Sequence, residues 1–562
     1  MNDAKLTGLI LAGSAANGEV LPLGEALSFW GGVDPASGHI IDVHHAGHGA
    51  ALAGKVVMMP TSRGSCSGSG VLLQLALSGN APAALIFLER EEVLTLGALV
   101  SELAFETPVV VVRLSRDAYE NVAKADRVSI ADGVLTAGEC SVPLRRPATD
   151  ALDLNETDQA MLTGGKTPSR LAMEVLCRIA VSQGADRLVD VTRGHIDGCI
   201  LAHDANLIFA EKMAELGASV AIPTTMNAIS VDRDRWERQG VPEAFGKRAS
   251  RLADAYTGMG AVPTFTCAPY LLKDAPSQGE CLGWSESNAV IYANSVLGAR
   301  TAKHPDYLDL CIAMTGRAPF SGVYSDEGRR AGIVIDVEAP IAVDDGFWPL
   351  LGWLIGRASP NAIPLIRGLA HLTPSPDDLK GLCAAFGTTS GAPMLHIEGV
   401  TPEAEMPVRD GADQVLLNAG DFRAAWDALN AANATVDLVA IGAPHASASE
   451  VGRIGAALHG RELAESVAMI VTLGRDVVAE LGGEVDELKA LGVQFYVDLC
   501  WCSITEPLLP PEAKVVVTNS GKYAHYGFGL HGRQMRFAGL ETCVEAAVTG
   551  RLPDELPNWL RP

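Results

Sequence analysis

The chain has 562 residues, 48% of them hydrophobic and 20% charged, which predicts several domains with buried sheets and excludes extended disorder. Its formal net charge of -24 argues against nucleic acids and anionic membrane surfaces as partners. Eleven scattered cysteines do not suit a secreted disulfide framework, and no apolar run reaches the ~20 residues that span a bilayer. We therefore expect a cytoplasmic protein. Its expected oligomeric state is a monomer or a small homo-oligomer.

The first 140 residues are predicted to form short strands with glycine-rich turns and one clear helix. The apolar stretch before Gly13 is expected to be the first strand, and residues 83–88 and 108–114 are candidates for buried strands. Residues 71–77 predict a helix that ends at Gly79. Residues 141–149, which contain prolines and arginines, are interpreted as part of a linker.

A loop rich in glycine and serine, Arg63–Gly70, immediately precedes this helix. Its backbone N–H groups and the positive helix terminus favour an anion, and Ser65 and Cys66 add a hydroxyl and a thiol. A simple turn would have the same composition. A further alternative is a nucleophile elbow, because the pattern Gly-x-Cys-x-Gly around Cys66 is similar to that of some cysteine hydrolases.

After the linker the chain continues with helices and then alternates strands and helices. Thr167 and Pro168 are typical of a helix start, and the apolar stripe that follows ends near Gly184. Further on, His195 and Asp197 lie two residues apart. On an extended segment both would face one side, which suits acid–base chemistry as well as a structural turn.

The clearest alternation of strands and helices runs from about residue 436 to 522 and predicts a parallel sheet. In such a sheet all the turns at the carboxyl ends of the strands lie along one edge, where ligands bind. The turns bring together His445, Arg475, Cys500, Cys502 and Lys522. This set of groups suits a carboxylate substrate beside a metal.

Three cysteines are candidate metal ligands. Cys500 and Cys502 flank Trp501 directly after an apolar strand, and Cys267 ends another apolar run. In an intracellular chain, thiolates at strand ends favour a soft metal over a disulfide, so an iron–sulfur or zinc site is expected. Buried thiols without a function are the alternative, and we keep that interpretation for Cys140, Cys177, Cys199, Cys311 and Cys543.

With these residues identified, the chain resembles the aconitase X family, a divergent branch of the aconitase superfamily, over nearly its whole length. The resemblance rests on long strings of residues rather than on short patterns. The matching segments are Ser28–Pro35, Gly64–Gly70, Ile222–Asn227, Pro263–Tyr270, Glu286–Arg300, Gly399–Glu403 and Thr518–Lys522.

The resemblance implies an α/β fold: an aconitase-like large catalytic part with parallel sheets, plus a small N-terminal swivelling β/α domain. The expected boundaries are 1–140 for the small domain, 141–155 for a linker that acts as a hinge, and 156–562 for the large part, whose last subdomain begins at about residue 430.

The resemblance also implies a dehydratase. The fused single-chain branch of the family dehydrates cis-3-hydroxy-L-proline, a small hydroxy amino acid, to Δ1-pyrroline-2-carboxylate. The two-chain branch dehydrates mevalonate 5-phosphate and is the alternative. Because the small part is fused ahead of the large one here, the hydroxyproline branch is favoured. The chain departs from the archaeal pattern of cysteines at Ala443 and Ala446, so Cys502 is the expected third thiol.

The roles implied by the resemblance are as follows. An iron–sulfur cluster, 2Fe-2S in this branch, would be held by Cys267, Cys500 and Cys502 and would act as a Lewis acid. Ser65 would be the base. The proton donor to the leaving hydroxyl would be His195 or His445. The substrate would be bound by Arg63, Cys66, Thr225, Asn288, Ser520 and Lys522.

Two other classes of protein remain open from the sequence. A cysteine hydrolase that uses Cys66 would be colourless and sensitive to alkylation. A metal-storing or regulatory protein would be coloured but would dehydrate no hydroxy acid.

Overall fold

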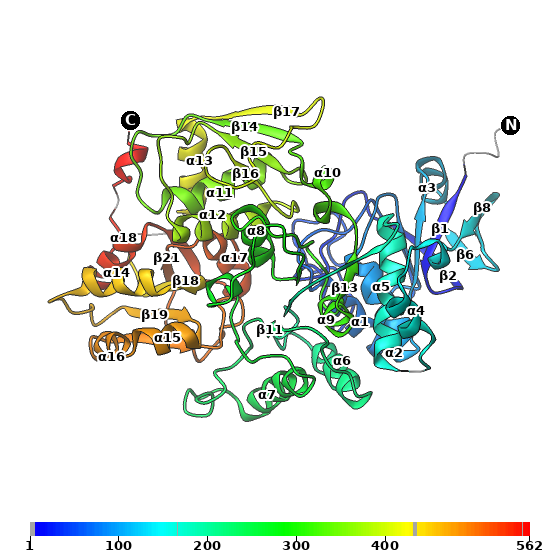
Figure 1. Ribbon diagram of the computed structural model, residues 1–562, viewed down its shortest axis with the longest axis horizontal. Helices are drawn as coiled ribbons and strands as arrows, with labels where there is room; N and C mark the ends of the chain where they lie inside the picture. Colours follow the sequence, from blue (N-terminus) through cyan, green and yellow to red (C-terminus); the bar gives the residue numbers. More distant parts are fainter. Residues whose placement is uncertain (1–5, 166, 431–434, 554, 562) are drawn as a thin grey trace. The chain divides into compact units, whose positions relative to one another are not determined.

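A computed structural model describes residues 6–165, 167–430, 435–553 and 555–561. The chain divides into two compact units. The first contains residues 1–224, 254–261 and 304–321, and the second contains 225–253, 262–303 and 322–562. Each unit is mixed α/β (Figure 1). Within the described ranges, every helix is too short or too polar to cross a membrane.

The first unit begins with a closed barrel in the order β1-β5-β4-β3-β2-β6-β7-β8. Strands β2 to β5 pair in parallel, whereas β6, β7 and β8 form an antiparallel meander. The strands are β1 Gly8–Ala12, β2 Ala16–Pro22, β3 Val56–Met59, β4 Ala84–Phe87, β5 Val110–Leu114, β6 Arg127–Ala131, β7 Val134–Ala137 and β8 Cys140–Arg145. The barrel's helices are α1 Gly68–Ser78, α2 Val93–Phe105 and α3 Arg116–Val122.

Successive side chains of the barrel strands point to opposite faces, and β3 and β4 are buried along their whole length. Val56 and Met58 of β3, like Ile86 of β4 and Val112 of β5, belong to one buried cluster. The predicted strands at 83–88 and 108–114 and the predicted first strand are therefore confirmed. The linker prediction is wrong for residues 141–145: Val142 points into the same cluster, and β8 closes the barrel against β1.

The first unit continues with α4 Glu156–Thr163, α5 Pro168–Gln183, β9 Leu188–Asp190, β10 Gly194–Ile196, α6 Asp204–Glu215, α9 Leu308–Thr315 and β13 Arg317–Pro319. The start of α5 matches its prediction, since the Thr167 side chain accepts the N–H of Arg170 and Pro168 takes the first helical position. Short strand β11 Thr224–Met226 and helix α7 Glu243–Gly258 lie where the chain passes from one unit to the other.

The second unit contains two parallel sheets. One has the order β16-β15-β14-β17, from β14 Ile333–Val337, β15 Pro364–Arg367, β16 His396–Ile397 and β17 Asp413–Leu417. Helices α11 Phe347–Ala358, α12 Pro376–Thr389 and α13 Ala419–Leu429 share a hydrophobic core with this sheet. The unit also contains β12 Gly283–Trp284, α8 Ser287–Ser295 and α10 Asp326–Arg329.

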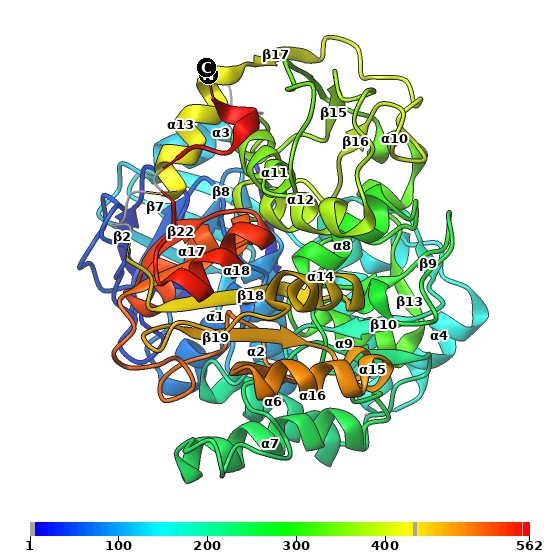
Figure 2. The same ribbon diagram turned by 90° about the vertical axis from the view of Figure 1, so that its left-hand side faces the viewer.

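The other sheet has the order β20-β19-β18-β21-β22 and is parallel throughout. Its strands are β18 Leu438–Ala446, β19 Ala468–Leu473, β20 Val493–Val497, β21 Val515–Thr518 and β22 Gln534–Phe537. Its helices are α14 Ala448–Leu458, α15 Arg475–Leu481, α16 Gly483–Ala490, α17 Gly521–His531 and α18 Leu540–Thr549, and Figure 2 shows β18 and β19 side by side.

Both faces of this five-stranded sheet are buried, which explains why its strands read as continuous apolar runs. Val439 and Ile441 face one hydrophobic cluster, and Leu438 and Ala440 face another. The structure corrects one boundary: the turn expected at residues 442–445 belongs to β18, where Gly442 adopts a φ of +98° and the register against β19 shifts. His445 therefore lies in a strand.

Candidate active site

Three thiols meet in the second unit. Cys267 and Cys500 are buried in one small cluster with Ala228, and half-buried Cys502 packs against it. The Cys500 thiol exchanges hydrogen bonds with both Cys267 and Cys502. Cys500 acts as donor toward Cys267, which raises the pKa of Cys500, and Cys502 acts as donor toward Cys500, which raises the pKa of Cys502. The three cysteines expected to act together are thus adjacent, although 233 residues separate Cys267 from Cys500 in the sequence.

The loop that carries Cys267 is fixed from several sides. The Cys267 sulfur accepts the backbone N–H of His445 at 3.3 Å, and the Asn288 amide donates to the Cys267 carbonyl at 3.0 Å. Thr266 accepts the N–H of Ala268 at 3.1 Å. Asn288 also accepts the hydroxyl of Tyr270 at 2.8 Å. Asn288 therefore holds the thiol loop, a role that sequence reasoning had not given to it.

The turn that carries Cys500 and Cys502 is held by a buried aspartate. Asp498 adopts a φ of +68°, an uncommon conformation for a residue other than glycine, and its side chain is buried. Arg475 donates to both of its oxygens at 2.6 Å in a forked pair. The guanidinium also pairs with Asp234, so Arg475 braces the turn instead of standing free along the sheet edge.

Trp501 anchors the same turn from inside. Its ring is wholly buried, and its N–H donates to the carbonyl of Ile441 in β18 at 2.8 Å. The backbone N–H of Cys500 also donates to the hydroxyl of Ser503 at 3.3 Å. An indole inserted between two cysteines ties their backbone to the central strand of the sheet.

A buried ion pair lies next to the thiols. Lys522 Nζ is 2.9 Å from Glu286 Oε1, and the two side chains are only 14% and 11% exposed. Although burial lowers the pKa of Lys522, the attraction of Glu286 and of the three cysteines raises it well above its ordinary value. Conversely, burial raises the pKa of Glu286, but Lys522 lowers it. The Lys522 ammonium opposes the raised pKa values of Cys500 and Cys502 but does not outweigh the causes that raise them.

His445 has both ring nitrogens engaged. Nε2 lies 2.7 Å from the Leu499 carbonyl, and Nδ1 lies 3.2 Å from the Thr266 hydroxyl. Burial lowers the pKa of His445 to about 4, so the ring is neutral near pH 7. A neutral imidazole that links the Cys267 loop to the Cys500 turn is better suited to positioning the thiols than to the proton transfer expected from the sequence.

The remaining residues expected in this unit are placed as follows. Ser520 caps α17 by accepting the N–H of Tyr523 at 3.1 Å and donates to the Ala443 carbonyl, so it too is structural. Thr225 lies in β11 and forms a bridge with Val262. Lys522 is the residue of this group whose charge is adjacent to the thiols.

The glycine- and serine-rich loop of the first unit folds as expected. It leads into α1, which begins at Gly68, with Ser67 as its N-cap. The Ser65 hydroxyl accepts the N–H of Ser67 at 3.3 Å and lies 3.4 Å from the Ser67 hydroxyl. A backbone N–H aimed at this oxygen stabilises negative charge on it. Arg63, which was expected to bind the substrate, pairs with Asp42 at 3.1 Å.

Carboxylates surround Cys66 in this unit. Its thiol donates to Asp197 at 3.2 Å, and ligand atoms of Cys66, Asp197 and buried Asp306 lie within 4.8 Å of one another. That spacing is short enough for a cation to bridge them. The partner expected for the Cys66 nucleophile of a hydrolase is an imidazole, whereas the observed partner is a carboxylate. His195 is fully buried in β10.

Sequence reasoning missed Glu286 and Thr266 as parts of the site. Both lie in segments that carried the family resemblance, Glu286–Arg300 and Pro263–Tyr270. Glu286 lies between Ser285 and Ser287, so its polar neighbours give no signal of a buried carboxylate that needs a cation, although Lys522 was already a candidate. Nothing in the sequence pairs the two, because the contact spans 236 residues.

Comparisons with known proteins agree with this architecture. Four domain models match: the aconitase X swivel domain at residues 5–137, the first domain at 151–327, the second at 331–427 and the third at 436–549. These matches define a multidomain α/β enzyme of the aconitase type, with its swivel domain first. The chain belongs to the aconitase X family, and it is a hydro-lyase, that is, a dehydratase.

Three similar proteins are informative. Cis-3-hydroxy-L-proline dehydratase of Pseudomonas aeruginosa is 49% identical over 98% of this chain and 97% of its own length. The protein of the same name from Hypocrea jecorina is 43% identical over 97% of this chain and 95% of its own. The crystal structure of Thermococcus kodakaraensis aconitase X (holo-form) superposes with a TM-score of 0.63 at 28% identity, covering 70% of this chain and all of that one.

Proposed function

We propose that this dehydratase converts cis-3-hydroxy-L-proline to Δ1-pyrroline-2-carboxylate. The reaction removes the proton from Cα and the hydroxide from Cβ, which together leave as water. The resulting enamine then moves a proton from nitrogen to carbon and becomes the cyclic imine. The two relatives of that name support this substrate, because each aligns with this chain over nearly its full length and therefore has the same domains.

The observation that carries the proposal is the convergence of three thiols beside the buried pair of Lys522 and Glu286. Three sulfur donors beside one buried, salt-bridged ammonium fit an iron–sulfur cluster, which thiolates bind. Cys267, Cys500 and Cys502 would hold it, and a 2Fe-2S cluster is our preferred assignment. When bound, such a cluster supplies a Lewis acid for a hydroxyl group.

Lys522 is the proposed binding group for the substrate carboxylate. Its ammonium is adjacent to the thiols and has one identified carboxylate partner, Glu286. An ammonium has three donors, so Lys522 can retain Glu286 and bind a second carboxylate. The ion pair keeps the Lys522 ammonium protonated. An incoming carboxylate therefore meets a full positive charge in a largely dry environment, where the attraction is strong.

Ser65 is the proposed base for the Cα proton. A serine hydroxyl ionises only weakly, so its alkoxide needs stabilisation from its surroundings. The N–H of Ser67 provides one donor at 3.3 Å, and the start of the 11-residue helix α1 adds positive potential. Cys66, Asp197 and Asp306 form a second polar group beside this loop, and His195 remains a candidate proton donor to the leaving hydroxyl.

The experiment begins with anaerobic purification followed by incubation with cis-3-hydroxy-L-proline. The imine is trapped as a coloured adduct with an aminobenzaldehyde reagent, and mevalonate 5-phosphate is tested in parallel. Adduct formation with visible absorption in the protein supports the proposal. Activity on mevalonate 5-phosphate alone would move the chain to the other branch. A colourless protein that is inactive on both, or a coloured one that is inactive on both, would refute the proposed reaction.

A further inference from the structure

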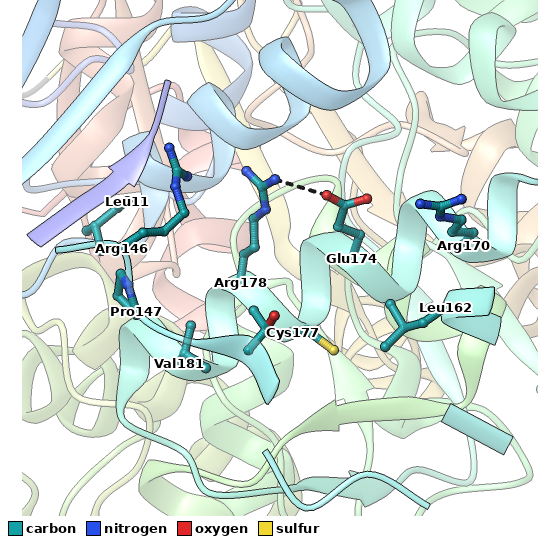
Figure 3. A pocket seen from close by; sticks show the side chains of 10 residues that line it. Leu11, Arg146, Pro147, Leu162, Arg170, Glu174, Cys177, Arg178 and Val181 are labelled. Atoms are coloured by element: carbon teal, nitrogen blue, oxygen red, sulfur yellow. Dashed lines mark hydrogen bonds and ion pairs between the residues drawn. The ribbon is translucent and has the colours of Figure 1, made fainter. Parts of the chain in front are cut away.

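The first unit contains a cavity to which the dehydratase reaction assigns no role. Its volume is about 290 Å³, and it lies between β1, the connection that follows β8, and helices α4 and α5. Figure 3 shows its lining side chains. The cavity is formed partly by the swivel domain, through Leu11, and partly by the first domain, through Leu162 and α5.

Three guanidinium groups line this cavity: those of Arg146, Arg170 and Arg178. The lining contains a single carboxylate, Glu174. The chain as a whole has a formal net charge of -24, whereas the lining of this cavity carries a local excess of positive charge.

The three arginines differ in how many charged partners they have. Arg178 pairs with Glu174 at 2.9 Å, the contact marked in Figure 3, and with Glu102 at 3.3 Å. Arg146 donates to the carbonyl oxygen of Gly13, a partner without charge. Among the residues that the structure describes, Arg170 has no ion-pair partner. Since each guanidinium carries five N–H donors, Arg146 and Arg170 have donors available for an oxyanion.

The position of Arg146 is fixed by the strand beside it. Gly13 directly follows the first barrel strand and has a φ of +66°; its N–H donates to Glu102 at 2.8 Å, and its carbonyl accepts from Arg146. Glu102 in turn pairs with Arg178 of α5. Two of the three arginines are thus pre-oriented by one network, which lowers the entropy lost when a ligand binds.

Apart from Thr149, the rest of the lining is apolar or carries a thiol. Leu11, Leu162, Val181 and Pro147 line the cavity together with the side chain of Cys177. A small site with a few charged groups and apolar walls is typical of one that binds an organic molecule by a charged end.

We propose that this cavity binds a small molecule through a carboxylate or phosphate group, with Arg146 and Arg170 as the principal ligands and Arg178 in support. The ligand would contact the barrel, the connection after it and helix α5 at once. Binding would therefore tie the swivel domain to the first domain. The proposal does not depend on the identity of the dehydratase substrate.

The test is calorimetric titration of the full chain with inorganic phosphate and, separately, with succinate, at ~0.1 M salt to screen weak surface binding. Saturable binding of phosphate alone would identify a phosphoryl ligand, and saturable binding of succinate alone a carboxylate ligand. For the probe that binds, Arg170→Gln and Arg146→Gln should each weaken binding about tenfold or more, because each removes a charge-assisted hydrogen bond.

Two further variants complete the design. Arg170→Lys keeps the positive charge but loses the two-pronged hydrogen bonding of a guanidinium. Its affinity for the probe should therefore lie between those of the native chain and Arg170→Gln. Arg116→Gln, an equal loss of charge on an exposed helix residue outside the cavity lining, should bind like the native chain. Binding of neither probe, or binding that Arg170→Gln and Arg146→Gln leave unchanged, would overturn the proposal.

Discussion

Lys522 Nζ lies 2.9 Å from Glu286 Oε1 in a largely buried pair, next to the three thiols of the second unit. The pair joins α17 to the residue that precedes α8, so it ties the five-stranded sheet to the segment that carries Asn288. Removing either partner leaves the other charge largely buried without a counter-ion. The free energy of unfolding should therefore fall by a measurable amount.

Lys522→Met should lower the free energy of unfolding of the second unit by about 3–5 kcal/mol, because Glu286 is left buried and unpaired. The double variant Lys522→Met with Glu286→Gln should recover much of that loss. Urea unfolding followed by tryptophan fluorescence measures both. Lys247→Met, which breaks an exposed pair with Glu243 on α7, is the control and should leave the transition in place. Equal losses in the single and double variants would mean that the pair is not coupled.

Ser65→Ala should lower kcat by roughly 100- to 10,000-fold, the range for loss of a general base, while the visible absorption of the protein stays unchanged. The measurement is initial rate of imine formation alongside the absorption spectrum. Ser67→Ala is a matched control: it retains the N–H that donates to Ser65 and removes only a hydroxyl 3.4 Å away, so its loss should be much smaller. A normal rate for Ser65→Ala would rule out this serine as the base.

Cys500→Ser should abolish bound iron, because the thiol lies between the other two and a serine oxygen is a poorer ligand for a soft metal site. Iron analysis and visible absorption after anaerobic purification provide the measurement. Cys311→Ser, on a cysteine buried in α9 of the first unit, should retain both iron and colour. Retention of iron by Cys500→Ser would contradict the ligand assignment.

Arg475→Leu should loosen the turn that carries Cys500 and Cys502, since Asp498 would keep its buried carboxylate but lose its forked partner. Bound iron should then be lost to a chelator several times faster than from the native chain, with the rate followed by bleaching of the visible absorption. Arg423→Leu removes an exposed pair with Asp427 on α13 and should not change the bleaching rate. Unchanged bleaching in Arg475→Leu would show that the fork does not support the thiols.

His203 should make the first unit sensitive to acid. Burial lowers its pKa from 6.5 to about 4, so between these values the unfolded chain binds a proton that the folded chain does not. Its contribution to stability is complete above pH 6.5 and is lost as the pH falls towards 4, with a slope of about 1.4 kcal/mol per pH unit for one proton.

His203→Leu should therefore show a smaller fall in Tm between pH 7 and pH 5 than the native chain, as measured by differential scanning calorimetry. His459→Leu, on an exposed residue after α14, should show the native fall. Parallel Tm curves for His203→Leu and the native chain would exclude this linkage.

Much of the fold could be predicted because its signals are local. The strands of the barrel and of the five-stranded sheet are apolar runs separated by turn residues, and Ser447 with Glu450 forms a capping box, a local device, at the start of α14. The linker prediction failed at residues 141–145 because Pro143 and the arginines suggested an irregular segment. Inside a barrel, the alternation around Val142 outweighs those residues.

The candidate site could be predicted only in part. Strand ends of one parallel sheet share an edge, which is why Cys500, Cys502 and Lys522 were expected near one another. His445 was expected there as well, but its hydrogen bonds to Leu499 and Thr266 give it a different role. Such details depend on the orientation of side chains from separate segments, which periodicity does not encode.

By itself, the sequence determined the kind of structure this is: an acidic α/β chain with parallel sheets, a glycine- and serine-rich loop containing Ser65 just before a helix, and thiols at strand ends. Those features depend on propensity, pattern and turn chemistry, which act over a few residues. Only the tertiary structure decided that Glu286 balances Lys522, that Asp498 receives the Arg475 fork and that three arginines surround one cavity. Each is a contact between segments that are distant in the sequence. A buried charge is stable only where packing supplies a partner, and the local sequence does not specify that partner.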